Sequence, residues 1–391
     1  MERTERPTTS TRDPDELRDR LEAWLARVLP PGAGPSVSDV EVPGATGMSS
    51  ETLLFEAAWR EGGDPREPEN PKKPENPKKP QNPKKEALVA RIAPDPSAVP
   101  VFPVYDMGRQ FETIRLVGEL SDVPVPQVRW CEPEGAELGA PFFVMDRVEG
   151  EVPPDVMPYT FGDNWFADAR PEQQRHLQHA TVSVLVRLHG IPDAATVFGF
   201  LASPHAGDTP LRRHVAEQWA YYQWVAEGVP SPLIERAFAW LDDHWPSDIG
   251  PTALSWGDSR IGNVMYRDFE PVAVLDWEMA GLGPPEIDIA WMIFLHRFFE
   301  DLAHDLELSG LPHVMRRDDV AATYESLSGY APRDLDFYCV YAALRHAIVM
   351  SRVRRRSIHF GEAEMPDDVD ELIMHRQALE AMLAGTYWSN I

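Results

Sequence analysis

The chain has 391 residues, with 37 Lys and Arg against 63 Asp and Glu and a formal net charge of −26. At roughly 100–200 residues per domain, this length predicts two or three domains. The negative balance disfavours a general nucleic-acid binder, which needs a basic face to neutralise phosphates. No apolar run reaches the roughly 18–20 residues of a membrane span, and the polar N-terminus lacks the apolar core of a secretory signal. The two cysteines make neither a disulfide framework nor a zinc site. We therefore expect a reduced, cytoplasmic protein with no nucleic-acid partner and no membrane span.

Residues 1–36 are expected to form a polar tail followed by an amphipathic helix. Asp13 and Pro14 suit the N-cap and first position of this helix. Leucines then recur every fourth residue as far as Leu29, which predicts one apolar face. The segment PPGAGP at 31–36 ends the helix.

Residues 37–148 predict a small α+β lobe. The alternating or apolar runs at 37–42, 52–59, 87–92, 127–132 and 141–148 predict strands. The spacing of apolar residues over 106–120 predicts a helix in the same lobe.

A proline- and lysine-rich repeat at 62–85 interrupts this lobe. It contains all six lysines, and prolines recur at every third residue, which is the period of a polyproline II helix. It has too few apolar residues to pack in a core, so we expect an extended, solvated loop between two strands. The segment is either an inert expansion of a surface loop or a proline-rich ligand for a partner. A mechanism that needs a catalytic lysine is excluded unless that lysine lies here.

Residues 149–391 predict a larger, mainly helical lobe. Helices are expected at 173–189, 213–227, 233–244, 286–304, 334–356 and 367–386. A β-rich island at 254–277 interrupts them. A cleft between the two lobes is the natural place for a ligand.

Three polar residues of the island point to phosphoryl transfer. Asp258 follows a short apolar run, Asn263 comes five residues later, and Asp276 ends the second strand of a predicted hairpin. A hairpin folds back on itself, so it can bring Asp276 near Asn263 while Asp258 faces the same site. One carboxylate can then accept the proton of a hydroxyl, while an amide oxygen and the second carboxylate hold Mg²⁺ against phosphates.

The sequence GDSRIGNVMY…VLDWEMAG, within 256–281, resembles the signature of the aminoglycoside phosphotransferase and choline-kinase-like family of small-molecule kinases. The resemblance extends over about 37–300. It implies a bilobal, protein-kinase-like α+β fold and transfer of the γ-phosphoryl group of ATP, or of GTP, to a hydroxyl. It also implies that Asp258 is the catalytic base and that Asn263 and Asp276 are the magnesium ligands.

The resemblance further implies a nucleotide loop and a cation that pairs with a glutamate. The small-residue segment at 44–50 contains Gly44, Thr46, Gly47 and Ser49, the expected phosphate-contacting positions. On its own, this segment is equally compatible with an ordinary hairpin turn.

The family cation is normally a lysine on the third strand, and here Arg91 takes that position. Glu112, on the helix at 106–120, matches its partner. Arginine stays charged and can bridge phosphate and carboxylate.

The segment VMDRV at 144–148 matches the hinge that would hydrogen-bond adenine, with Met145, Asp146 and Val148 as the contributing residues. A buried edge strand is the alternative reading, and it is compatible with that role.

The chain departs from the family pattern beside the base. The family has His two residues before the catalytic Asp, where this chain has Trp256, and an aromatic residue after it, where this chain has Ser259. We expect Trp256 to pack in place of the histidine. Asp288 matches an acidic residue that supports the catalytic loop, although a carboxylate in the first turn of a helix is also favourable by itself.

Three further features allow both a structural and a functional reading. His189 ends a long helix, where a structural role is the more common one. The aromatic residues at 219–224 suit core packing or an acceptor pocket. The arginines at 352–356 suit a solvated helix end or an anion clamp.

The sequence favours an ATP- and Mg²⁺-dependent kinase acting on a small-molecule hydroxyl. The acceptor is left open between an aminoglycoside-like compound and a hydroxyacyl or lipid-like compound. The latter is suggested by a resemblance of VLDWEMAGLG and MDRVEG to kinase domains fused to acyl-CoA dehydrogenases. The alternative is a nucleotide-binding regulator or scaffold that docks through its proline-rich loop. A protein kinase is disfavoured because no APE pattern follows Asp276.

Overall fold

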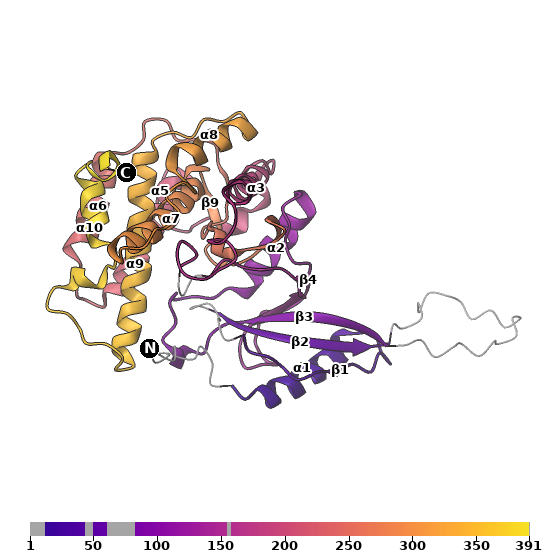
Figure 1. Cartoon of the computed structure of the whole chain (residues 1–391). Coiled ribbons are helices and arrows are strands. Elements are labelled where there is room, and N and C mark those ends of the chain that lie inside the picture. The colour runs from indigo at the N-terminus through magenta and orange to yellow at the C-terminus, as the bar shows by residue number, and fades with distance from the viewer. Residues whose placement is uncertain (1–11, 44–49, 61–82, 155–157, 391) are drawn as a thin grey trace, which may run out of the picture. The chain divides into compact units, whose positions relative to one another are not determined.

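The computed structural model describes residues 12–43, 50–60, 83–154 and 158–390 (Figure 1). The chain divides into two compact units. Among the described residues, the first unit runs up to Pro100 and adds Val104–Phe111 and Gln127–Arg147. The second consists of Val101–Pro103, Glu112–Pro126 and the chain from Val148 onward. A sheet-based unit and a mainly helical unit make the fold α+β, as the sequence predicts.

The first unit is built on a five-stranded antiparallel sheet with the strand order β1-β2-β3-β5-β4. Its helix and strands are α1 (Pro14–Val28), β1 (Ser36–Val37), β2 (Glu51–Trp59), β3 (Lys84–Ile92), β4 (Val128–Glu132) and β5 (Phe142–Asp146). β2 and β3 pair along their whole length, with Thr52 opposite Arg91. This pairing fixes which side chains stand beside the start of β2.

Helix α1 packs on the sheet through its apolar face (Figure 1). The Asp13 side chain accepts a hydrogen bond from the backbone of Asp15, which confirms the expected N-cap. The buried Trp24 ring lies 4.8 Å from that of Phe142 and 6.0 Å from that of Trp130. Aromatic packing of this kind anchors the N-terminal helix to the sheet.

Two predictions for this unit need correction. The strand expected over 37–42 ends at Val37, and Glu41 forms only an isolated bridge with Leu54. The backbone N–H groups of Ser38 and Glu41 donate to the oxygens of Glu56 and Leu54 on β2, so three residue steps on one strand lie opposite two on the other. The extra residue interrupts the hydrogen-bond ladder in the same way as a β-bulge. The loop expected over 62–85 ends earlier, because β3 begins at Lys84. Residues 61–82 lie outside the described part of the chain.

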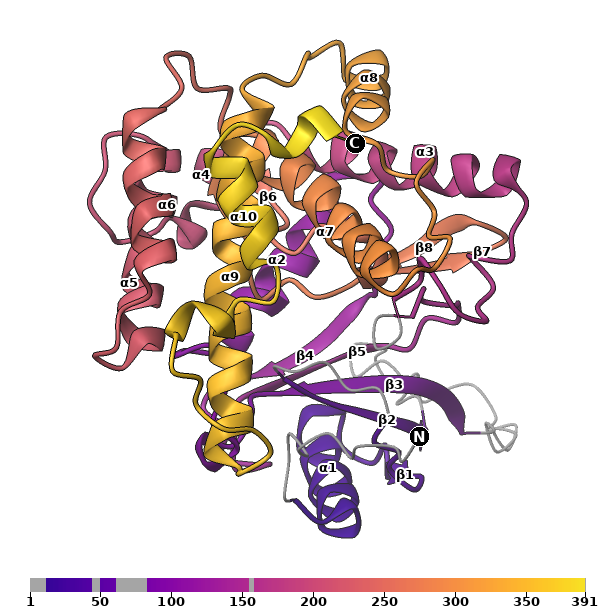
Figure 2. The same ribbon diagram turned by 60° about the vertical axis from the view of Figure 1, so that its left-hand side comes forward.

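The second unit is mainly helical, and α9 packs against α5, α6, α7 and α10 (Figure 2). Its helices are α3 (Pro171–His189), α4 (Ala194–Val197), α5 (Pro210–Ala226), α6 (Pro232–Asp243), α7 (Glu286–Asp305), α8 (Arg317–Ser328), α9 (Leu335–His359) and α10 (Arg376–Leu383). Helix α2 (Met107–Leu120) begins in the first unit and ends in the second. Two short antiparallel pairs complete the unit. They are β6 (Ala253–Ser255) with β9 (Gly281–Gly283) and β7 (Val264–Arg267) with β8 (Glu270–Val274).

The helical predictions hold except at the C-terminus. The helix expected over 367–386 is a 3-10 turn, Val369–Leu372, followed by the shorter α10. The Asp368 side chain caps the turn, and Ile373 is extended, so the helix restarts only at Arg376. Helix α8 was not predicted from the sequence, although Val320 and Tyr324 are buried one turn apart on it.

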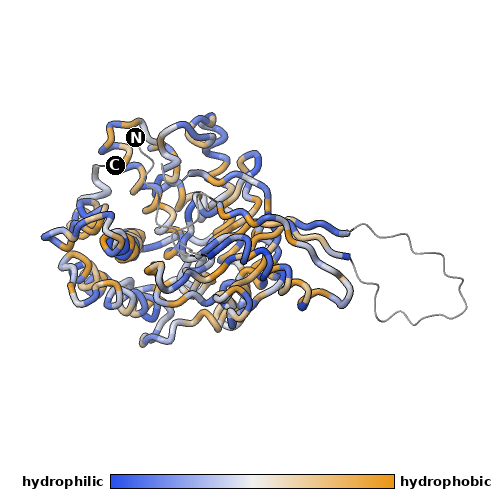
Figure 3. The backbone as a smooth tube through the Cα atoms, turned by 90° about the horizontal axis from the view of Figure 1, so that it is seen from below, coloured by the Kyte–Doolittle hydropathy of each residue, from blue (hydrophilic) through white to orange (hydrophobic). Residues whose placement is uncertain are grey.

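Hydrophobic and hydrophilic stretches alternate along the helices, as expected where one side of a helix packs and the other faces water (Figure 3). Within the described residues, the structure contains no helix both long and apolar enough to cross a bilayer.

Candidate active site

The loop that carries Asp258 starts with a turn that only glycine can form. Gly257 follows β6 with a φ of +92°, and a Cβ there would lie 2.0 Å from the backbone oxygen of Met279. Strand β6 pairs with β9, Ser255 lying opposite Gly281, which brings these two chain segments together. A non-glycine residue would be strained by its backbone angle and would also clash.

Asp288, in the first turn of α7, holds this loop in place. Its buried carboxylate accepts hydrogen bonds from the backbone N–H groups of Trp256 and Gly257, at 2.7 and 2.9 Å. It also accepts from the Ser255 hydroxyl and the His189 ring, at 2.8 and 3.0 Å. Burial raises the pKa of the Asp288 carboxyl, but the hydrogen bond and charge of His189 and the two N–H groups outweigh it, so the net shift is downward. Asp288 thus supports the loop, and His189 has a structural role within reach of the site.

Trp256, which we expect to pack in place of the family histidine, is fully buried. Its indole N–H is directed at the backbone oxygens of Leu275 and Asp276, at 2.9 and 3.2 Å. The side chain therefore ties the loop before Asp258 to the end of β8. The hydroxyl of Ser259, the other departure, donates to the backbone oxygen of Asp288 at 2.8 Å.

The Asp258 carboxylate receives three side-chain N–H donors. Oδ1 accepts from Trp291 Nε1 at 2.7 Å. Oδ2 accepts from Asn263 Nδ2 at 2.7 Å and from Arg260 Nε at 3.1 Å. The Asp258 side chain is 17% exposed, so it is held by these donors but can still be reached from solvent.

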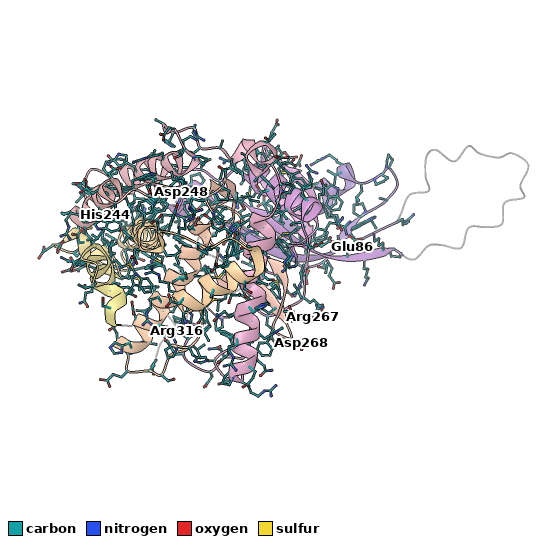
Figure 4. All side chains as sticks on the ribbon, turned by 90° about the horizontal axis from the view of Figure 1, so that it is seen from above. Glu86, His244, Asp248, Arg267, Asp268 and Arg316 are labelled. Carbon is teal, nitrogen blue, oxygen red and sulfur yellow. The ribbon has the colours of Figure 1, made fainter. Side chains whose placement is uncertain are left out.

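The hairpin of β7 and β8 brings Asn263 and Asp276 together. Asn263 ends a 3-10 turn just before β7, and its backbone oxygen accepts the N–H of Leu275 at 2.9 Å. Asp276 follows with a φ of +61°, a left-handed conformation that aspartate tolerates better than most residues. Figure 4 labels Arg267 and Asp268, which lie side by side at the turn of this hairpin.

These two residues fit a magnesium ion that is shared with a nucleotide. Among the described residues, no group of three or more His, Cys, Asp and Glu is placed to hold a metal. Mg²⁺ is instead commonly bound by one or two carboxylates together with substrate phosphates. Asn263 and Asp276 supply one amide oxygen and one carboxylate, donors that this hard ion prefers.

In the first unit, Arg91 lies beside the start of β2. Its guanidinium donates to the hydroxyls of Thr52, at 3.1 Å, and Ser50. Ser50 directly follows the proposed nucleotide loop, and Gly44, Thr46, Gly47 and Ser49 of that loop lie outside the described residues.

Glu112 lies in the part of α2 that belongs to the second unit. Both of its carboxylate oxygens accept from Arg115 of the same helix, at 2.6 and 2.9 Å. This hydrogen bonding lowers the pKa of Glu112. The pair between Arg91 and Glu112 stays a prediction.

The proposed hinge is the end of β5 and the residues after it. Met145 pairs with Val89 of β3, and the Asp146 side chain accepts from Arg129 at 2.6 Å. The N–H groups of Asp146 and Arg147 are bonded to backbone oxygens of Gln127 and Ala87. Val148 follows directly.

The arginine run is solvated only in part, because Arg354 is exposed whereas Arg352 and Arg356 are buried. Arg352 and Arg356 are 6% exposed, and Arg352 pairs with Glu227 at 2.9 Å while lying over the Trp224 ring. In the aromatic cluster, Tyr221 and Tyr222 are buried, whereas Trp219 and Trp224 are about two-fifths exposed.

Sequence reasoning missed two residues that touch Asp258. Arg260 lies only two positions away and could have been noticed from its charge. Trp291 is 33 residues away, and its position one helical turn after Asp288 was the available signal.

The comparisons with known proteins identify the family of this chain. The family model described as the phosphotransferase enzyme family matches residues 81–322, more than half of the chain. The chain belongs to this family. Among solved structures, this family member is similar to a Ralstonia eutropha protein assigned as an aminoglycoside phosphotransferase, with a TM-score of 0.63 and 18% identity over 95% of this chain and 98% of that one. It is also similar to the aminoglycoside phosphotransferase APH(4)-Ia, crystallised with AMP-PNP and hygromycin B, with a TM-score of 0.51 and 16% identity over 93% of this chain and 97% of that one. At these identities the likeness establishes the phosphotransferase fold, which is the kinase-like bilobal α+β fold predicted from the sequence.

Curated relatives carry a different name. The chain is 26% identical to Probable acyl-CoA dehydrogenase IBR3 of Arabidopsis thaliana, over 63% of this chain and 31% of that protein. It is also 26% identical to acyl-CoA dehydrogenase family member 10 of Mus musculus, over 69% of this chain and 24% of that protein. The chain therefore spans between about a quarter and a third of these relatives.

Proposed function

We propose that this protein transfers the γ-phosphoryl group of ATP to a hydroxyl of a small molecule, with Asp258 as the base. The observation that supports this proposal most directly is the setting of the Asp258 carboxylate. It accepts hydrogen bonds from three side-chain donors and is still partly exposed. Phosphoryl transfer needs positioning and charge stabilisation more than covalent chemistry, and this arrangement supplies the positioning.

In the proposed reaction, Asp258 orients the acceptor hydroxyl and takes its proton as the hydroxyl oxygen attacks the γ-phosphorus. The bond between that phosphorus and the β,γ-bridging oxygen breaks, and ADP leaves. Asn263 and Asp276 would hold Mg²⁺, which when bound would neutralise charge on the phosphate oxygens. Arg91 would contact the nucleotide phosphates from the start of β2, and Asp288 would keep the catalytic loop fixed. Because the N–H groups of Asp146 and Arg147 are bonded, we expect Val148 to donate to adenine.

For the acceptor, we propose a hydroxyacyl thioester of coenzyme A. The support is the shared sequence with two relatives named as acyl-CoA dehydrogenases, which this chain matches over about two thirds of its own length. An aminoglycoside-like acceptor is the second candidate, favoured by the fold shared with aminoglycoside phosphotransferases.

The test is a mass-spectrometric screen for phosphorylated products. Purified protein, Mg²⁺ and ATP are incubated with separate pools of hydroxyacyl-CoAs, aminoglycosides and amino alcohols. Asp258→Asn runs in parallel, together with Asp268→Asn as a matched control, because Asp268 is exposed at the turn of the same hairpin. We expect one product that gains a phosphoryl group with wild type and Asp268→Asn but not with Asp258→Asn.

Two results would count against the proposal. A product formed equally well by Asp258→Asn would remove the assigned base. ATP binding without a product from any pool would favour the nucleotide-binding regulator or scaffold, with the segment at 62–85 as its docking element.

A further inference from the structure

Arg345 of α9 is a buried cation that the proposed reaction leaves unused. The residue is 1% exposed, and Nη2 donates to the backbone oxygen of Gly257 at 3.0 Å. In the described part of the chain, its Nε and Nη1 groups have no hydrogen-bond acceptor, and no carboxylate forms an ion pair with it. A buried charge is normally paired, so this exception requires an explanation.

The side chains that Arg345 lies over are aromatic. Its guanidinium carbon lies 4.5 Å from the ring centroid of Trp291 and 5.8 Å from that of Tyr341. The Tyr341 hydroxyl is hydrogen-bonded to His214, whose pKa burial lowers to about 3, so that ring is neutral at pH 7. Burial lowers the pKa of Arg345, while the negative charges of Asp288 and Asp258 oppose that shift.

The contacts form a continuous chain to the proposed base. Arg345 lies over the Trp291 ring and holds the oxygen of Gly257, the residue before Asp258. Trp291 is 3% exposed, and its indole N–H donates to Asp258 Oδ1. The side chain of Trp291 is therefore fixed between the cation and the carboxylate.

The donors divide unequally between the two carboxylate oxygens. Each oxygen has two lone pairs. Oδ2 accepts from both Asn263 and Arg260, whereas Oδ1 accepts only from Trp291 among the residues that the structure describes. Oδ1 thus keeps a lone pair for a substrate hydroxyl, and Trp291 sets the direction of that lone pair.

We propose that Trp291 and Arg345 are positioning residues, which orient Asp258 so that Oδ1 receives the proton of the acceptor hydroxyl. This inference rests on the proposed phosphotransfer function. It explains why an unpaired cation is kept in the core: the cation fixes the Trp291 ring by a cation–π contact and the base's loop by a hydrogen bond.

The test combines kinetics with stability in three variants. Trp291→Phe keeps the ring and removes the N–H donor, Arg345→Met removes the charge at similar size, and Arg345→Lys keeps the charge. We expect Trp291→Phe and Arg345→Met to lower kcat about tenfold or more, with KM for ATP changed less than about twofold. Arg345→Lys should recover much of the kcat lost in Arg345→Met. Because a buried, unpaired charge opposes folding, Arg345→Met should unfold at the same temperature as wild type or a higher one.

Arg297→Met is the matched control, since Arg297 is a mostly buried arginine of α7 that pairs with Asp301 at 2.8 Å. It should lower the unfolding temperature and leave kcat unchanged. Wild-type kcat in Trp291→Phe and Arg345→Met would overturn the proposal. So would a fall in kcat in Arg345→Met that is matched by a loss of folded protein.

A readout independent of activity separates this inference from the proposed function. The indole ¹H–¹⁵N resonance of Trp291, assigned by its loss in Trp291→Phe, should shift in Asp258→Asn and broaden in Arg345→Met. If wild type transfers phosphoryl groups but this resonance is the same in Asp258→Asn and Arg345→Met as in wild type, only the positioning role is contradicted. If the resonance changes in these variants but wild type transfers no phosphoryl group to any acceptor or to water, the proposed function is contradicted. This inference, which rests on that function, is then contradicted as well.

Discussion

Asp276 combines a carboxylate with a left-handed backbone, so its charge can be tested apart from its conformation. Asparagine has nearly the same size and tolerates a φ of +61°. We expect Asp276→Asn to weaken Mg²⁺-dependent ATP binding roughly tenfold or more, because ligand charge sets the affinity of oxygen sites for divalent cations.

The measurement is titration calorimetry with ATP at fixed Mg²⁺ and again in EDTA. The difference between the variants should be largest with Mg²⁺ and nearly absent in EDTA. Equal Mg²⁺ dependence in wild type and Asp276→Asn would remove Asp276 from the metal site.

At the scale of elements, the turn at Gly257 decides whether the catalytic loop can form. Gly257→Ala adds a Cβ against the backbone of Met279, whereas Gly329→Ala adds one at a φ of +75° with no atom within 4 Å. We expect Gly329→Ala to cost only the backbone strain, about 1 kcal/mol, and to keep full activity. Gly257→Ala should cost more and abolish phosphoryl transfer, since the loop must move away from Asp288.

Thermal unfolding and activity of both variants check this prediction. Similar behaviour of the two glycine variants would show that backbone conformation alone, and not the close approach to Met279, explains Gly257.

Elements with a strong local signal could be predicted from the sequence. The capped N-terminal helix, the β2–β3 hairpin and the hairpin between Asn263 and Asp276 follow from periodicity and turn residues. The short β9 could not be found in this way, because its sequence is Gly-Leu-Gly and only pairing with β6 makes it a strand. The bulge that ends β1 likewise depends on its partner strand.

In the candidate site, too, some residues have a local sequence signal and others depend on tertiary packing. Asp258, Asn263 and Asp276 lie close in sequence, and the resemblance singled them out. Arg345 reaches the Asp258 loop only through the packing of α9, so no local pattern could place it there. Trp291 reaches Asp258 from α7, and its signal in the sequence was its position one helical turn after Asp288.

At the scale of the whole molecule, buried histidines should make the protein acid-sensitive. Burial lowers the pKa of His296 to about 3 and that of His375 to about 4, and it lowers the pKa values of His214 and His346 as well. These rings are neutral in the folded protein but take up protons below about pH 6.5 once unfolded. Their contribution to stability is therefore complete above about pH 6.5 and is lost as pH falls toward 4, by up to about 1.4 kcal/mol per pH unit for each ring.

This prediction is checked by measuring the thermal unfolding midpoint at several pH values between about 7.5 and about 4.5. This range includes the pKa of about 6.5 that histidine has in an unfolded chain. The midpoint should fall steadily below about pH 6.5. The exposed His359 provides the control, because His359→Gln should leave the slope unchanged. A level midpoint across this range would contradict the neutral, buried state of these rings.

The central claim is that Asp258 is the base of a phosphoryl transfer. The most direct measurement is the turnover of Mg²⁺-ATP with the acceptor found by the screen, or with water if none is found, alongside the dissociation constant of ATP for the same samples. We predict that Asp258→Asn lowers kcat by about 10²–10⁴-fold, the usual contribution of a positioned base, while Asp268→Asn matches wild type and all three bind ATP alike. Turnover by Asp258→Asn at the wild-type rate would contradict the account.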